Sequence, residues 1–210
     1  MLAKNDNILV NMKISDIYQE QVDFTYKGFS RKSIGKTLSE LIAEVPNLFG
    51  GNFTTPIATL RQSALANNIS AMSKYCEEIG FELAPHVKTH MSPQLAAEQM
   101  KFGAKYLTVA TMWQARVFLE FGFKSIIIAN EVSDISDLSE IAEINRDPLY
   151  EVICYVDSLA GAKLIADALA NTPSGSIHLF IEIGYKNGRG GVRDLSDLKA
   201  LCETLVEIPG

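Results

Sequence analysis

The stretch KYLTVATMWQARVFLEFGFKSIIIA, Lys105 to Ala129, decides the fold, because it holds a strand, a helix and a second strand in direct succession. KYLTVA has the composition of a short strand, and the residues from Thr111 to Phe121 are expected to form a helix that ends at Gly122. Ser125 to Ala129 is a continuous apolar run, typical of parallel strands that are covered on both faces. Two strands joined by a helix predict a parallel pair.

The same alternation extends toward the N-terminus. A strand is expected at Ile57–Leu60, followed by a helix over 65–79 whose apolar residues recur at spacings of three and four, and which ends at Gly80. A second strand is expected from Phe81 to about Lys88. The Ser92-Pro93 pair then offers an N-cap and a first-turn proline for a helix that ends at Gly103.

Toward the C-terminus the pattern predicts helix 136–144, strand 152–157, a helix capped by Asp157-Ser158, strand 177–183 and a last helix over 195–208. Six βα units in sequence predict a parallel sheet flanked by helices, either doubly wound or closed into a barrel. A (β/α)8 TIM-type barrel needs eight units and about 250 residues. If the fold is a barrel, we therefore expect it to be truncated after about six units.

Two domains are expected. Residues 1–53 mix short helical patches with glycine and proline and predict an N-terminal extension, with Gly50-Gly51 as its boundary. Residues 54–210 carry the regular alternation and predict one incomplete barrel domain.

Composition excludes several classes of protein. The chain has 210 residues, of which 47% are hydrophobic, which suits a globular core. No apolar run reaches the ~18 residues of a membrane span, and the N-terminus lacks a signal-peptide core, so we expect a cytoplasmic protein with no membrane partner. The net charge of -6 and the lack of a dense basic cluster argue against a nucleic-acid partner. Cys76, Cys154 and Cys202 lack metal-ligand spacing and are interpreted as reduced core thiols.

The stretch LAPHVKTHMSPQ, Leu83 to Gln94, is the strongest candidate for a site, because it places His86, Lys88 and His90 two residues apart. On a strand the three side chains would share one face. On a helix the two histidines would form a pair at i and i+4 that suits a metal. Pro85 and the β-branched residues around it favour the strand. Lys88 would then lie at the carboxyl end of a barrel strand, where active sites of this architecture lie, as a nucleophilic amine or as a lysine that extends into solvent.

The chain resembles the D-threonine aldolase and D-serine dehydratase-like proteins, in particular the amino-acid deaminase subgroup. These are pyridoxal-phosphate (PLP) enzymes with an alanine-racemase-type barrel. Four stretches carry the resemblance: TTPIATL, APHVKTHMSPQLAAEQMKFGAKYLTVATMWQARV, IIIANEV and IEIGYKNGRGGVR. The resemblance runs from about Asp23 to the C-terminus, and PHVKTH is its most specific block.

The resemblance implies roles for four residues. Lys88 matches the lysine that forms an imine with PLP, and Arg189 matches an arginine beside the phenolic oxygen of that cofactor. His86 and His90 would flank the imine as catalytic groups. An arginine at this position would keep the phenolic oxygen ionised.

The implied function is a PLP-dependent lyase acting on D-amino acids that carry a β-hydroxyl, of the aldolase or dehydratase type. The alternatives are a non-catalytic PLP-binding fragment and an amino-acid racemase. A divalent metal belongs to the full family fold, with ligands outside this chain, and a homodimer is implied. Met91 stands where the aldolases commonly carry a lysine, and Arg61 where many relatives carry an aspartate, so the subgroup stays open.

Overall fold

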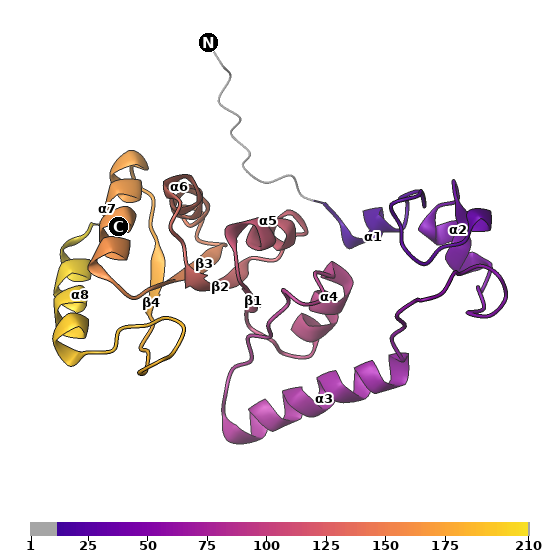
Figure 1. Ribbon diagram of the computed structural model, residues 1–210, viewed down its shortest axis with the longest axis horizontal. Coiled ribbons are helices and arrows are strands. Elements are labelled where there is room, and N and C mark those ends of the chain that lie inside the picture. The colour runs from indigo at the N-terminus through magenta and orange to yellow at the C-terminus, as the bar shows by residue number, and fades with distance from the viewer. Residues whose placement is uncertain (1–11, 210) are drawn as a thin grey trace, which may run out of the picture.

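The computed structural model describes residues 12–209 and contains one parallel sheet (Figure 1). Its strands are β1 (Leu107–Val109), β2 (Ser125–Glu131), β3 (Glu151–Val156) and β4 (His178–Ile181), hydrogen-bonded in the order β1-β2-β3-β4. Spatial order therefore follows sequence order. A doubly wound sheet reverses its strand order at a switch point, whereas a barrel does not. The order of the strands thus favours the barrel over the doubly wound alternative.

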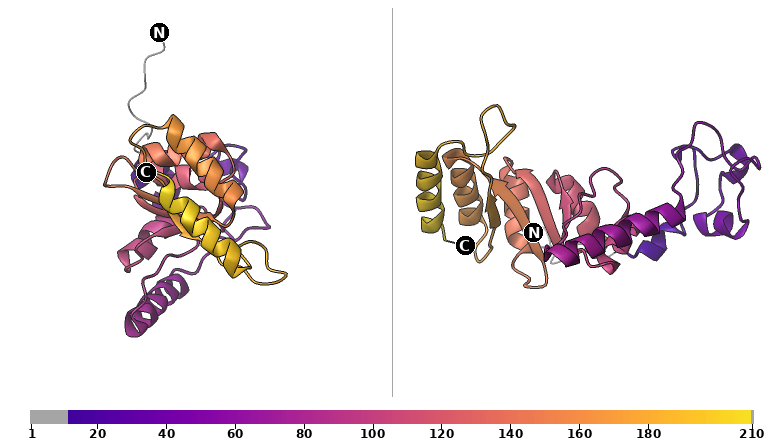
Figure 2. Two further views of the ribbon diagram at one scale, coloured as in Figure 1. Left: turned by 90° about the vertical axis from the view of Figure 1, so that its left-hand side faces the viewer. Right: turned by 90° about the horizontal axis from the view of Figure 1, so that it is seen from below.

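Five helices follow the extended segments in turn: α4 (Pro93–Lys101), α5 (Met112–Glu120), α6 (Ile135–Ile144), α7 (Leu159–Asn171) and α8 (Leu195–Glu207). The last two lie side by side next to the sheet (Figure 2). Strand β2 is fully covered on one face only, because Ile126 and Ile128 are fully buried while Ile127 between them is only half-buried. The prediction that this run is covered on both faces is wrong.

The predicted starts and ends of the helices agree with the structure. The side chains of Ser92 and Thr111 accept the N–H groups of Leu95 and Gln114 at 3.4 and 3.3 Å, as N-caps do. Gly122 has a positive φ of 82° at the end of α5. At α7 only Ser158 acts as the cap, so the predicted capping role of Asp157 is wrong.

The first two predicted strands are only partly formed. Within residues 12–209, nothing pairs with residues 57–60 as a strand, and the following helix α3 (Gln62–Ile79) buries none of its residues and extends away from the sheet (Figure 1). Residues 83–87 do run parallel to β1, since Val87 N–H donates to Thr108 O and Thr108 N–H to Pro85 O, both at 2.8 Å. They form a single bridge, at His86. A strand forms only where a neighbouring segment pairs with it, and residues 57–60 have no such neighbour in the described chain.

The N-terminal segment forms a small unit away from the sheet in Figure 1, with α1 (Ile14–Ile17), a 3-10 helix η1 (Arg31–Ser33) and α2 (Leu38–Ala43). Val22 and Leu41 are buried there. The boundary near residue 53 stays a prediction. No helix among residues 12–209 has the length and apolar character to cross a membrane. The three cysteines are free, but only Cys154 is buried, so the prediction of core positions is wrong for Cys76 and Cys202.

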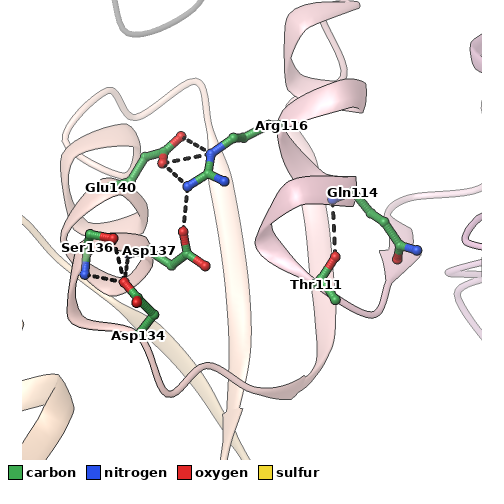
Figure 3. A network of polar contacts seen from close by, with 7 residues as sticks. All are labelled: Thr111, Gln114, Arg116, Asp134, Ser136, Asp137 and Glu140. Atoms are coloured by element: carbon green, nitrogen blue, oxygen red, sulfur yellow. Dashed lines mark hydrogen bonds and ion pairs between the residues drawn. The ribbon is translucent and has the colours of Figure 1, made fainter.

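An ion-pair cluster joins α5 to α6 (Figure 3). Arg116 Nε donates to both carboxylate oxygens of Glu140, at 2.9 and 2.8 Å, and Nη2 donates to Asp137 at 2.5 Å. These side chains are 38%, 23% and 28% exposed. The pairs are therefore partly shielded from solvent.

Replacing Arg116 with methionine, which keeps the aliphatic stem, should lower the free energy of unfolding by about 1 kcal/mol or less. The loss should shrink in high salt, because salt screens partly exposed charges. Urea denaturation at low and high salt measures both effects. Lys163→Met is the matched control: its pair with Asp167 is more exposed, so its effect should be smaller. Equal losses in the two variants would show that the Arg116 cluster contributes no more to the free energy of unfolding than an exposed ion pair.

Candidate functional site

Polar side chains gather where the strands end. Glu131 is the last residue of β2, and Asp157 and Glu182 directly follow β3 and β4. Glu131 pairs in register with Tyr155, two residues before Asp157, and Tyr155 pairs with Phe180, two residues before Glu182. Because paired residues share a face and side chains alternate along β3 and β4, all three carboxylates lie on the face opposite the buried Val152 and Cys154.

The three carboxylates form a tight cluster, with one oxygen of each within 4.8 Å of the others. Oxygen ligands in this arrangement could contact one hard cation. Glu131 Oε1 is buried and has no hydrogen-bond partner in the described chain. Burial raises the pKa of Glu131, and the neighbouring carboxylates of Glu182 and Asp157 raise it further. Glu131 is therefore harder to ionise in the folded protein than in the unfolded chain.

This raised pKa predicts a pH dependence of stability. A carboxyl group whose pKa is higher in the folded state than in the unfolded state stabilises the fold at pH values below its unfolded pKa, here the ordinary 4.5. This contribution to the free energy of unfolding is lost as the pH rises through the pKa of the folded state. Glu131→Gln keeps the size and shape of the side chain but carries no charge. Its free energy of unfolding, relative to wild type, should therefore increase from pH 4.5 to pH 8 in urea titrations. A difference that does not change with pH would contradict the raised pKa of Glu131.

Lys88 lies at the same edge of the sheet. Val87 is fully buried and pairs with β1, so the chain is anchored one residue before the lysine. Residues 88–90 then form a turn, and Lys88 is exposed. Its side chain makes no hydrogen bond or ion pair within the described residues. The structure thus offers a free amine at the carboxyl end of this segment, although not on a regular strand as predicted.

His86 lies two residues earlier, on the bridge to β1. Its Nδ1 is 2.8 Å from the carbonyl oxygen of Thr108. A carbonyl only accepts, so Nδ1 carries a proton and Nε2 of the neutral ring is free to accept one. Burial lowers the pKa of His86, and the nearby charge of Lys88 lowers it as well. His86 is therefore a neutral base near the lysine.

His90 has a different environment. The backbone N–H of Ser92 donates to its Nδ1 at 3.0 Å, which ties the ring to the start of α4. Burial lowers the pKa of His90. The expectation that His86, Lys88 and His90 project together from one strand is wrong, because the turn at 88–90 breaks the alternation. The catalytic role of His90 stays a prediction, and its contacts favour a structural role at the helix start.

Arg189 lies in the loop after β4, and its side chain is exposed. The loop leaves the carboxyl end of β4, so Arg189 and Lys88 belong to the same edge of the sheet. Four strand spacings separate them, about 19 Å measured along the sheet. Curvature of the kind found in barrels shortens the direct path between them.

Sequence reasoning missed Glu131 and Glu182 and misassigned Asp157. The sequence contained a signal, because each acidic residue follows an apolar run, directly in VICYVD and HLFIE and after Asn130 in IIIANE. Parallel strands that are neighbours bring their carboxyl ends together, so three acidic ends in consecutive units predict a cluster.

Comparisons with known proteins agree with this architecture. Residues 60–210 match the family described as alanine racemase, N-terminal domain. The chain is 26% identical over 156 residues to D-threonine aldolase of Arthrobacter sp., and 31% identical over 138 residues to D-threo-3-hydroxyaspartate dehydratase of Delftia sp. (strain HT23). A solved structure of D-threonine aldolase from Filomicrobium marinum superposes with a TM-score of 0.68 at 23% identity, over 75% of this chain and 42% of that one. The predicted fold class is thereby confirmed.

The two curated relatives are much longer than the region they share with this chain. The matches include 74% and 66% of this chain, but 40% and 36% of the relatives. The similarity therefore covers the part of those proteins that corresponds to the sheet and its helices.

Proposed function

Because the chain belongs to the family of alanine racemase N-terminal domains, we propose that it works as a PLP-dependent lyase on D-amino acids with a β-hydroxyl group. The observation that carries the proposal is Lys88: an exposed amine, free of partners in the described chain, directly after the buried anchor Val87. The two curated relatives, an aldolase and a dehydratase, support the reaction class.

The side chains at this edge fit PLP chemically. PLP offers an aldehyde, which a lysine amine attacks, and an anionic phenolic oxygen, which a guanidinium binds well. Lys88 and Arg189 supply these two groups, and neither side chain makes a hydrogen bond or ion pair within residues 12–209. Both are thus available to a ligand.

PLP, when bound, supplies an electron sink for the bond that breaks at the substrate Cα. Lys88 would hold the cofactor covalently and, once the substrate amine has replaced it, could move a proton as a free amine. Neutral His86 would accept a proton at Nε2 while Thr108 O keeps its ring oriented. Arg189 would keep the phenolic oxygen charged.

The test is to incubate the purified chain with PLP, reduce it with borohydride and map the modified peptide by mass spectrometry. The expected result is a pyridoxyl adduct at Lys88. Lys105→Ala is the control, because Lys105 is exposed but precedes β1 at the opposite edge of the sheet, so labelling at Lys88 should persist. Labelling spread over many lysines would contradict a specific site.

The reaction type follows from product analysis with D-threonine, D-serine and D-threo-3-hydroxyaspartate. Glycine plus an aldehyde identifies an aldolase, a keto acid with ammonia identifies a dehydratase, and loss of optical purity alone identifies a racemase. Activity measured with and without added divalent metal tests the expected metal requirement. Light scattering measures the mass in solution and tests the expected homodimer.

A further inference from the structure

The loop that carries Arg189 folds back onto the end of β4. Gly184 N–H donates to Val192 O at 2.9 Å, and Val192 N–H donates to Glu182 O at 2.8 Å. The two sides of the loop touch: a Cβ on Gly191 would lie 2.6 Å from the Cα of Gly184. Gly191 also has a φ of +90°, so both space and backbone conformation require glycine there. The base of the loop is therefore closely defined.

Arg193 holds the outer side of the loop. Its Nε donates to Tyr185 O at 3.2 Å, and its Nη2 donates to Gly188 O at 2.8 Å. These bonds shape the loop but do not attach it to another strand, because all three residues lie after β4.

Asp157 makes that attachment. Its Oδ2 accepts the N–H of Gly191 at 3.0 Å, from the end of the neighbouring strand β3. Gly191 is buried, and its donor would lack a partner if this carboxylate were removed. Arg189 stands only two residues before the attached amide.

The other two carboxylates support the same contact. The loop rests on Glu182, because a Cβ on Gly190 would lie 2.6 Å from its Oε2. Glu131 lies beside it, because the same Cβ on Gly190 would be 3.6 Å from Glu131 Oε1.

We propose that Asp157 is a positioning residue that fixes the Arg189 loop at the carboxyl edge of the sheet by accepting the N–H of Gly191. The role of Arg189 toward the cofactor rests on the proposed function. The attachment of the loop does not, so the two can be tested separately.

The first measurement needs no cofactor. Hydrogen exchange of the loop peptide over residues 184–193 is followed by mass spectrometry in the complete chain. Asp157→Ala should speed exchange of this peptide about tenfold, the equivalent of one lost hydrogen bond. Asp157→Asn keeps an acceptor oxygen and should restore near wild-type protection. Asp167→Ala, which removes an exposed aspartate on α7, should change nothing. Unchanged exchange in Asp157→Ala overturns the proposal, whatever the cofactor does.

The second measurement titrates PLP and follows its absorbance. Asp157→Ala should weaken PLP binding in the same direction as Arg189→Ala, while Asp157→Asn should bind nearly as wild type does. If Asp157→Ala loosens the loop yet binds PLP as tightly as wild type while Arg189→Ala does not, the positioning role is wrong. If wild type takes up no PLP at Lys88, the proposed function fails, and the exchange result still decides whether Asp157 holds the loop.

Discussion

Replacing Lys88 with alanine should abolish turnover of D-β-hydroxy amino acids. Loss of a catalytic nucleophile typically lowers the rate by on the order of 10⁴-fold or more, and Lys88 is the amine that the proposed chemistry depends on. Lys88→Arg should be equally inactive, because a guanidinium keeps the charge but is not a nucleophile at neutral pH. The measurement is kcat/KM together with the absorbance of bound PLP.

Lys105→Ala serves as the matched control for this prediction. It removes an exposed lysine from the opposite edge of the sheet and should leave kcat/KM unchanged. Turnover by Lys88→Ala within tenfold of wild type would contradict the assignment of the lysine. Equal loss in both lysine variants would point to a general effect of charge.

The largest effect on stability is expected at Phe118 of α5. Its side chain is fully buried and packs edge-to-face on Phe123, with ring centroids 5.8 Å apart. Phe118→Ala would leave a cavity and remove buried apolar surface, which should lower the free energy of unfolding by about 3–5 kcal/mol. Urea denaturation measures it as a lower midpoint with an unchanged slope.

Trp113 on the same helix provides the comparison. It is 63% exposed, so Trp113→Ala should change the free energy of unfolding by about 0.5 kcal/mol or less. Similar losses for the two aromatic residues would mean that α5 does not pack on the sheet as described.

Local signals predicted the central elements well. The helices starting at Ser92 and Thr111 and the strand beginning at Ser125 were visible because capping residues and apolar periodicity act over a few neighbours. The pairing of strands was less visible. Residues 57–60 have strand composition, but no partner lies beside them in the described chain, and composition alone does not form a strand.

The candidate site was also predicted only in part, because local motifs were visible in the sequence and contacts between distant residues were not. The motif around Lys88 identified the exposed amine, and the glycine-rich stretch identified the Arg189 loop. The turn at residues 88–90, with Met91 at a φ of 45°, separates His90 from Lys88. The alternating pattern of the sequence does not indicate such a turn. Asp157 looked like a helix cap because an acidic residue before serine suits one, yet its carboxylate binds Gly191, which is distant in sequence.

The strand order β1-β2-β3-β4 also has a consequence for how the sheet forms during translation. Each strand pairs with the one made just before it, so no strand has to wait for a distant segment to leave the ribosome. Paired residues such as Leu107 with Ile126 and Ile153 with His178 are 19 and 25 residues apart in sequence, so each pairing needs only the helix between the two strands to have been made. The sheet can therefore grow one unit at a time from the N-terminal side, in step with synthesis.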